Sequence, residues 1–333
     1  MNILSNDQII LNLIKEANIS DASKRLFELQ KEEWPMLATG VKSLETIKSK
    51  SFQFDGFNIK AQFNVGRMTS TSAKVDPKSI RERKCFLCTQ NLPTEQKGIL
   101  YNYNYIILCN PFPIFPTHFT LTHKEHQPQR ILDTFPDMLD LSKDLSKHYS
   151  VIYNGPRCGA SAPDHLHFQA GNKYFMPIDD DFHQIKNEYG KEIFENDNIS
   201  IFAIDDGIRK FISIECMIKE LLVDTFNKIY KTYSEVMNEE QEPLMNLISF
   251  YEEEYGWRVI IFLRAKHRPA VFFAEDESKM LVSPASIDLG GVCVFPREED
   301  FERITKVQIS EIFKEVFIDA EKLDSLVRKL RLV

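Results

Sequence analysis

Residues 154–169 read Asn-Gly-Pro-Arg-Cys-Gly-Ala-Ser-Ala-Pro-Asp-His-Leu-His-Phe-Gln, a glycine-containing loop that runs directly into the pattern His-x-His-x-Gln. The apolar residues 151–153 before it predict one strand, and the alternation of His165, His167 and Gln169 predicts a second. Alternate residues of a strand point to the same side, so these three polar side chains would face one ligand. This strand–loop–strand unit decides both the fold and the place of the site.

The pattern fits nucleophilic catalysis at phosphorus. A neutral imidazole can attack an α-phosphate and form a nucleotidyl-histidine, which divides one displacement into two easier steps. Its other ring nitrogen should then donate to a fixed acceptor, such as a backbone carbonyl. Polar residues also alternate on exposed strands without any catalytic role, and a bare His-x-His-x-Gln would favour that interpretation. The loop favours catalysis, because its glycines allow close approach to a ligand and its N–H groups, with the Ser161 hydroxyl, could bind an anion.

Cys85-x-x-Cys88 is a second candidate site. Two thiolates at this spacing provide half of a tetrahedral zinc site, and the chain has no second Cys-x-x-Cys. The other ligands would therefore be histidines, and the candidates are His118, His123, His126 and His165. An unliganded pair of buried thiols is the alternative.

Composition excludes some functions. The net charge is −8, which disfavours a non-specific nucleic-acid binder, because affinity for the phosphate backbone comes from cations. No apolar run approaches the roughly 18 residues that span a membrane, and the first residues do not resemble a secretory signal. Six cysteines in 333 residues are too few for a disulfide scaffold. We expect a soluble, cytoplasmic protein with reduced thiols.

Periodicity along the chain predicts an α+β fold. Helical spacing covers 7–50, 131–149, 221–237 and 309–332, and strands are expected at 52–63, 105–109, 119–122, 199–204, 211–216, 247–251, 257–263, 271–273 and 292–295. The two halves share a rhythm of hairpins and a helix without a sequence repeat. The acidic run 179–181 predicts a boundary or a surface excursion.

Basic residues gather in two places. Residues 64–84 predict a solvated loop, in which Arg67 and Lys74 are the best candidates for phosphate contacts. Residues 264–268, Arg-Ala-Lys-His-Arg, could hold a phosphate, but a basic turn on the surface is favoured. Residues 288–291, Asp-Leu-Gly-Gly, predict a tight turn.

A family resemblance rests on two segments. Residues 110–126, Asn-Pro-Phe-Pro-Ile-Phe-Pro-Thr-His-Phe-Thr-Leu-Thr-His-Lys-Glu-His, resemble the first hairpin of histidine-triad proteins. Together with residues 154–169 they resemble the branch of that superfamily that contains galactose-1-phosphate uridylyltransferase, diadenosine tetraphosphate phosphorylase and GDP-L-galactose phosphorylase. The similarity covers roughly residues 60–172, and beyond them it is architectural.

The resemblance implies a role for each matching residue. His167 matches the nucleophile, and Gln169 the amide that separates the transferases from hydrolases with a third histidine. Phosphate and ribose contacts are implied for the loop residues Asn154, Gly159, Ala160 and Ser161 and for Asn110. A structural zinc site is implied for Cys85, Cys88, His126 and His165. Two departures are Asp164 in place of a proline before His165, and His123 in place of the proline of the second strand.

We therefore expect an α+β chain with antiparallel sheets and packed helices, in which two histidine-triad-like halves form one compact unit. Residues 1–50 would be a helical N-terminal extension, 51–175 the catalytic half and 176–333 a second, degenerate half. The resemblance implies transfer of a nucleotidyl group from a nucleoside diphosphate sugar or a dinucleoside polyphosphate to phosphate or a sugar phosphate, and homodimers occur among the relatives. The alternatives are a dinucleoside polyphosphate hydrolase and a non-catalytic, zinc-stabilised nucleotide-binding protein.

Overall fold

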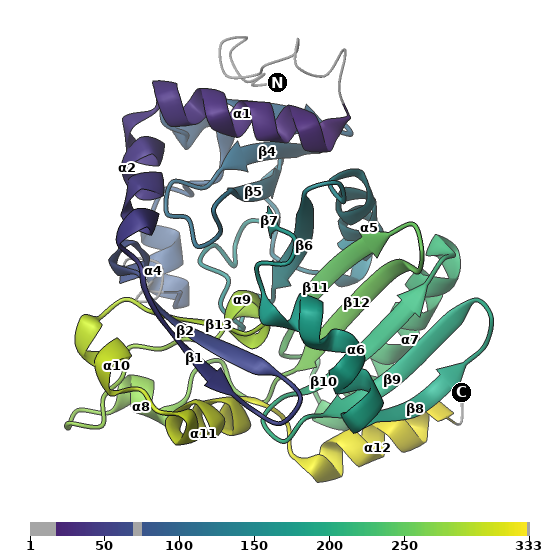
Figure 1. Ribbon diagram of the computed structural model, residues 1–333. Coiled ribbons are helices and arrows are strands. Elements are labelled where there is room, and N and C mark those ends of the chain that lie inside the picture. Colours follow the sequence, from purple (N-terminus) through teal and green to yellow (C-terminus); the bar gives the residue numbers. More distant parts are fainter. Residues whose placement is uncertain (1–17, 69–74, 332–333) are drawn as a thin grey trace.

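The computed structural model describes residues 18–68 and 75–331. An antiparallel sheet of ten strands spans it (Figure 1). The two halves of the chain meet in the middle of this sheet, where Asn154 lies opposite Asn246 and Val151 opposite Ser249. In spatial order the strands are β3 (Gly98–Tyr101), β4 (Tyr105–Cys109), β5 (His118–His123), β7 (His167–Asn172), β6 (Tyr149–Asn154), β11 (Met245–Glu252), β12 (Gly256–Leu263), β10 (Lys210–Cys216), β9 (Ile199–Asp205) and β8 (Gly190–Glu195).

The same order of elements occurs twice along the chain. The first half runs β3, β4, β5, a helix α5 (Phe135–Asp144), β6 and β7. The second half runs β8, β9, β10, a helix α7 (Lys219–Met237), β11 and β12. This repetition confirms the predicted α+β fold with two similar halves in one compact unit.

Alternate residues of the central strands enter two separate cores. In β12, Val259 and Ile261 belong to one core, whereas Ile260 and Phe262 belong to the other. This division follows from the pleat, which points successive side chains to opposite faces. The first core lies under α1 (Ile19–Glu33), α5, α7 and α12 (Ala320–Arg331), and the second under α6 (Pro177–Tyr189), α11 (Lys306–Val316) and a small sheet.

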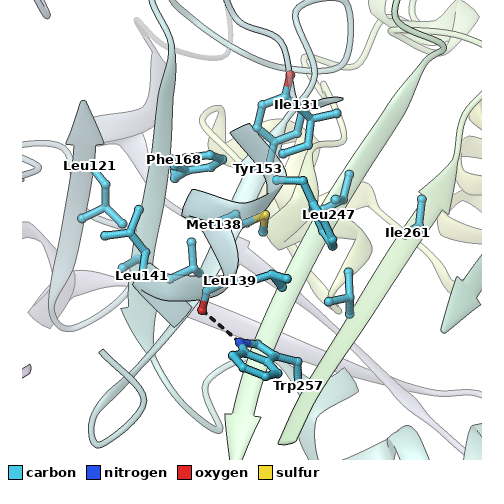
Figure 2. Packing of buried hydrophobic residues seen from close by; sticks show 14 of the residues in the cluster. Leu121, Ile131, Met138, Leu139, Leu141, Tyr153, Phe168, Leu247, Trp257 and Ile261 are labelled. Atoms are coloured by element: carbon cyan, nitrogen blue, oxygen red, sulfur yellow. Dashed lines mark hydrogen bonds between the residues drawn. The ribbon is translucent and has the colours of Figure 1, made fainter. Parts of the chain in front are cut away.

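Helix α5 anchors the first core. Its sequence places Pro136 in the first turn, where a missing backbone N–H costs nothing, so the helix begins at Phe135, within the predicted segment. The Phe135 ring stacks on Phe226 of α7 at 3.8 Å between centroids. Figure 2 shows the Trp257 indole N–H donating to the Leu139 carbonyl at 2.9 Å. The two equivalent helices and β12 are thereby packed together.

The small sheet joins distant parts of the sequence. It contains β1 (Lys48–Gln53), β2 (Asn58–Phe63) and β13 (Val292–Phe295). Strand β13 pairs with β2 in parallel, with Val292 opposite Lys60. The N-terminal helices that precede this sheet are α1, α2 (Pro35–Ser43) and the short η2 (Leu44–Thr46), so the described part of the predicted helical extension ends just before β1.

Four predicted segments differ from the structure. Residues 271–273 lie in a short helix, α8 (Ala270–Phe273), because short apolar runs do not distinguish strand from helix. The predicted terminal helix is two helices, α11 and α12. The acidic run 179–181 is part of α6, which buries Phe182 and Ile185, and strand β8 follows it. Within residues 64–84, predicted as a loop, the structure has η3 (Val65–Arg67) and α4 (Pro77–Glu82).

The remaining short elements are η4 (Thr89–Asn91), η5 (Leu132–Thr134), α9 (Ser286–Leu289) and α10 (Glu298–Arg303). Within the described residues no helix combines the length and apolarity that a membrane span requires.

Candidate active site

A pocket of about 640 Å³ lies beside the β6–β7 loop. Three parts of the chain line it: the N-terminal helices with the segment around Cys85, the strands β4, β5 and β7 with the loop, and the C-terminal segments 267–268 and 283–294. The apolar residues of the lining include Trp34, Met36, Phe86, Leu92, Leu108 and Phe112. The polar residues of the lining include Asn110, Asn154, Ser161, His167, Gln169, Arg67, His267, Arg268 and Asp288.

His167 begins β7 and is nearly buried, with 4% of its surface exposed. Its Nδ1–H donates to the His165 carbonyl at 2.8 Å, as predicted for a nucleophile that attacks through Nε2. Burial lowers the pKa of His167 to about 4, so the imidazole is neutral at physiological pH. Nδ1 of the ring is therefore occupied by the His165 carbonyl, and Nε2 is the unprotonated nitrogen of this pocket-lining residue.

Gln129 holds the backbone of His167, a role that no sequence pattern indicates. Its side-chain oxygen accepts from the His167 N–H at 2.8 Å. Its amide group donates to the carbonyls of His167 at 2.9 Å and Asn154 at 3.0 Å. The start of β7 and the end of β6 are thus fixed by one buried side chain.

Gln169 has a defined amide orientation. The Ile114 N–H donates to His118 Nδ1 at 3.2 Å, so His118 carries its proton on Nε2 and donates it to the Gln169 oxygen at 2.9 Å. Burial, followed by the charge of Arg67, lowers the pKa of His118 to about 3. With its oxygen occupied, Gln169 presents its NH₂ group as a donor in the pocket. His118, a candidate zinc ligand on sequence grounds, orients this amide instead.

The β6–β7 loop approaches the C-terminal half closely. Gly159 has φ +96°, and a Cβ at this position would lie 2.7 Å from the Ala285 side chain, so glycine meets both a conformational and a steric requirement. The backbone N–H groups of Gly159 and Ser161 make no hydrogen bond within residues 18–68 and 75–331. They are available to an anionic ligand, together with the Ser161 side chain.

Two further predicted contacts lie on the pocket wall. Arg67 donates to the Phe112 carbonyl at 2.8 Å, and although burial lowers its pKa to about 10, it is cationic at neutral pH. Asn110 accepts the Phe112 N–H at 2.9 Å, which leaves one lone pair of its side-chain oxygen for a ligand hydroxyl. Lys74 lies outside the described residues.

The C-terminal half contributes more than its sequence indicates. Arg264 is fully buried, so the prediction of a surface turn at 264–268 is wrong for this residue, and His267 and Arg268 line the pocket. Asp288 belongs to α9 and also lines the pocket, where the sequence predicts a tight turn. Burial raises the pKa of Asp288 to about 6 against the opposing effect of backbone donors and Arg67. His267, Arg268 and Asp288 lie about a hundred positions after β7 in the sequence, so only the folded structure shows that they line the same pocket.

Cys85, Cys88, His126 and His165 form a metal-binding geometry, with all four ligand atoms within 4.8 Å of one another. The sulfurs of Cys85 and Cys88 lie 3.3 and 3.5 Å from His165 Nδ1, and Cys88 Sγ lies 3.2 Å from His126 Nδ1. Tetrahedral zinc would place sulfur and nitrogen ligands about 3.5 Å apart, so the four residues fit this ion. Burial, followed by Cys85, raises the pKa of Cys88 to about 11, and a bound cation would hold both sulfurs as thiolates.

Outer contacts orient this cluster. His165 Nε2–H donates to the His123 carbonyl at 2.7 Å, which leaves Nδ1 as the ligand atom. Asp164, the residue that departs from the family pattern, accepts from Arg83 at 2.5 Å and lies 3.8 Å from His126 Nε2. The carboxylate at position 164 therefore supports the cluster from outside.

Comparisons with known proteins agree with this architecture. Residues 184–330 match a family described as GDPGP1-like, C-terminal domain, and residues 26–172 match a domain of unknown function, DUF4922. The structure of yeast Ap4A phosphorylase Apa2 in complex with Ap4A superimposes with a TM-score of 0.58 and 15% identity, covering 88% of this chain and 97% of that one. Its complex with AMP gives a TM-score of 0.55 and 15% identity, covering 85% and 96%.

A uridylyltransferase structure is more distant, with a TM-score of 0.40 and 10% identity over 74% of this chain and 92% of that one. No curated protein sequence matches the chain. The fold of this chain is thus the one seen in the yeast phosphorylase.

Proposed function

We propose that this protein is a nucleotidyltransferase of the phosphorylase type, with His167 as the covalent nucleophile. The observation that carries the proposal is the state of His167: buried and neutral, with Nδ1 committed to the His165 carbonyl. The substrate would be a nucleoside diphosphate sugar or a dinucleoside polyphosphate. Support for a nucleotide ligand comes from the shared fold with the yeast phosphorylase, which binds AMP and Ap4A.

In the first step, His167 Nε2 attacks the α-phosphorus, and the bond between this phosphorus and the bridging oxygen breaks. The electron pair leaves on a phosphate oxygen of the distal group, which is stable as an anion and needs no strong general acid. The imidazole of the nucleotidyl-histidine becomes cationic, and the His165 carbonyl stabilises it through the Nδ1–H bond. Inorganic phosphate or a sugar phosphate then attacks the same phosphorus and restores neutral His167.

Several donors suit the charge that develops on the phosphate. The NH₂ group of Gln169 and the loop N–H groups of Gly159 and Ser161 are unoccupied by other partners within the described residues. Arg67 adds a cation to the same wall, and Asn110 is placed to accept from a ribose hydroxyl. Donors aimed at developing charge in a desolvated site contribute strongly to rate.

Cys85, Cys88, His126 and His165 would hold zinc in a structural role. Four protein ligands close the tetrahedron and leave no position for water. The ion would fix the backbone of His165, whose carbonyl orients the nucleophile.

Mass spectrometry of the intact protein tests the proposal. After exposure to diadenosine tetraphosphate or to a panel of nucleoside diphosphate sugars, without phosphate, we expect a mass increase of one nucleotidyl group, mapped to the peptide with His167. Addition of inorganic phosphate should discharge the adduct as a nucleoside diphosphate. A His167→Asn variant should form no adduct, whereas the control His148→Asn, which removes a histidine outside the pocket, should behave as the parent.

Two outcomes would contradict the proposal. Release of a nucleoside monophosphate at a rate independent of phosphate would indicate a hydrolase with water as the acceptor. Binding of nucleotide without adduct or turnover would indicate a non-catalytic nucleotide-binding protein.

A further inference from the structure

Asn154 ends β6 on the pocket wall, and its side-chain oxygen is fully occupied. The backbone N–H of Ser286 donates to Asn154 Oδ1 at 2.9 Å, and Asn246 Nδ2 donates to it at 2.9 Å. A backbone N–H can only donate, so the atom it meets must be the oxygen and not the nitrogen of the amide. Asn154 Nδ2 makes no hydrogen bond within residues 18–68 and 75–331, although the residue is only 6% exposed. Its NH₂ group is therefore the part of the amide left for a ligand.

Asn246, which is fully buried, is itself fixed from behind. Arg264 Nη1 donates to Asn246 Oδ1 at 2.6 Å. The Asn246 NH₂ group then donates both to Asn154 and, at 2.7 Å, to the Cys158 carbonyl inside the β6–β7 loop. One amide of the C-terminal half thus holds the first polar side chain and the middle of the loop.

The environment of Arg264 is unusual for a buried cation. Its donors meet five oxygens of carbonyl type: Asn246 Oδ1 and the backbone carbonyls of Val316, Pro284, Lys266 and His267. Burial of a charge is costly unless its donors are satisfied, and these contacts satisfy them. The guanidinium thereby connects segments 264–267, 284 and 316 to the strand pair at the junction of the halves.

The fold explains why these residues meet. Asn154 and Asn246 are directly opposite each other in the β6–β11 pair that joins the halves. Cross-strand neighbours project to the same face of a sheet, so the two amides are adjacent because of the register alone. The β6–β7 loop begins directly after this strand pair, where the Gly155 N–H donates to the Met245 carbonyl of the C-terminal half at 3.2 Å.

We infer that Asn246 and Arg264 are positioning residues, which hold the Asn154 amide with its NH₂ group toward the α-phosphate of the bound nucleotide. This inference rests on the proposed function, because it requires a phosphate in the pocket. A freely rotating asparagine would present its oxygen to an anion as readily as its nitrogen, and the network removes that unfavourable orientation. The C-terminal half thereby determines that Asn154 presents a hydrogen-bond donor to the phosphate.

Calorimetric titration of nucleosides and their monophosphates tests the network. A panel of AMP, GMP and UMP selects the base, and the ratio of dissociation constants for nucleoside and monophosphate then reports the contribution of the phosphate. We expect Asn246→Leu to weaken binding of the monophosphate by about tenfold, the loss of one well-placed bond to a charged group, and to change nucleoside binding by less than about twofold. In an Asn154→Ala background, the same substitution should have almost no effect on either ligand.

A matched control is Asn172→Leu at the other end of β7. Asn172 also accepts a backbone N–H, from Thr117 at 2.7 Å in a partly buried contact, but does not line this pocket. This variant should lose stability without changing the ratio of dissociation constants. Arg264→Met should weaken binding of the monophosphate relative to the nucleoside. Arg264→Lys, which keeps a cationic donor, should restore part of this binding.

The outcomes separate the two proposals. Equal losses for Asn246→Leu in both backgrounds, or equal losses for nucleoside and monophosphate, would overturn the network while the proposed function stands. An unmodified protein that binds monophosphates no better than nucleosides would overturn the phosphate pocket, and the network with it. Preference for the monophosphate with full coupling, but without any covalent adduct, would retain the network and reject the proposed chemistry.

Discussion

The two halves of the ten-stranded sheet share one order of elements and differ in several connections, including the one between their last two strands. Between β6 and β7 the chain makes the long loop 155–166, whereas residues 253–255 alone connect the equivalent strands β11 and β12. The face that carries His167 and Gln169 in β7 carries Ile260 and Phe262 in β12, packed into the second core. The scaffold therefore does not determine the chemistry, which depends on one loop and on whether a strand face is covered.

The largest effect should come from the nucleophile. We expect His167→Asn to reduce nucleotidyl transfer by about 10⁴-fold or more, because the substitution removes the nitrogen that forms the proposed covalent intermediate. The equivalent region of the second half should be far less sensitive: Ile260→Val should change the rate by less than about twofold, since its cost is confined to packing. Initial rates of phosphate-dependent turnover measure both, and comparable losses would remove the functional asymmetry between the halves.

Metal content should depend on one half only. Cys88→Ser removes one of the four ligand atoms, whereas Cys216→Ser changes a buried thiol of β10 that lies outside the cluster. We expect the first variant to lose bound zinc and about 4 kcal/mol or more of unfolding free energy, the linkage for zinc at a thousand times its dissociation constant. The second should retain zinc. Elemental analysis combined with chemical denaturation provides the measurement, and full zinc content in Cys88→Ser would exclude this residue as a ligand.

Loss of a buried aromatic ring should lower the free energy of unfolding by a similar amount in either half. Phe135 of α5 and Phe226 of α7 stack on each other across the junction of the halves. Each substitution by alanine should lower the free energy of unfolding by about 3–5 kcal/mol, because both rings are fully buried. The double variant should lose less than the sum by about 0.5–1.5 kcal/mol, the coupling of a stacked pair. Strict additivity in denaturation would mean that the helices stabilise the halves independently.

Two buried groups, one in each half, should change stability with pH in opposite directions. In the first half burial lowers the pKa of His167 to about 4, so the unfolded state binds the proton first and stability falls as pH drops from about 6.5 to 4. In the second half burial raises the pKa of Glu242 to about 7, so the folded state holds the proton and stability falls as pH rises from about 4.5 to 7. Glu242→Gln should remove up to about 3 kcal/mol of the second trend, measured by denaturation at pH 5 and pH 8. An unchanged profile would show that Glu242 ionises normally.

The sequence predicts one side of the pocket well. Polar alternation at His165, His167 and Gln169, and the spacing of Cys85 and Cys88, are local patterns with a physical meaning. The structure places His167 and Gln169 in the pocket lining, whereas His165 joins the two cysteines in the metal-binding cluster, so His165 does not face the same ligand as the other two. The orientation of each amide is not predictable in this way. It depends on partners such as His118, Gln129 and Asn246, whose only signal is their position in the folded chain.

The part of the pocket that the C-terminal half contributes is not predictable from the sequence for a similar reason. Arg264 lies in a run of basic residues that is typical of a surface turn, yet five oxygens from separate segments enclose it. Asp288 precedes two glycines, which favours a turn, but it belongs to α9, which the β6–β7 loop approaches at Ala285. Long-range packing overrides local composition at both positions.

The parallel pairing of β13 with β2 also determines when the pocket can form during synthesis of the chain. The pairing joins residues 58–63 to residues 292–295, and segment 283–294 completes the pocket. Nearly the whole chain must therefore be synthesised before residues 283–294 can complete the lining of the pocket beside His167. Contacts between such distant residues form late and slow folding. A nascent chain that ends before residue 283 carries His167 and the cysteine pair but lacks this part of the pocket lining, so we expect the proposed activity to appear only when nearly the whole chain has been synthesised.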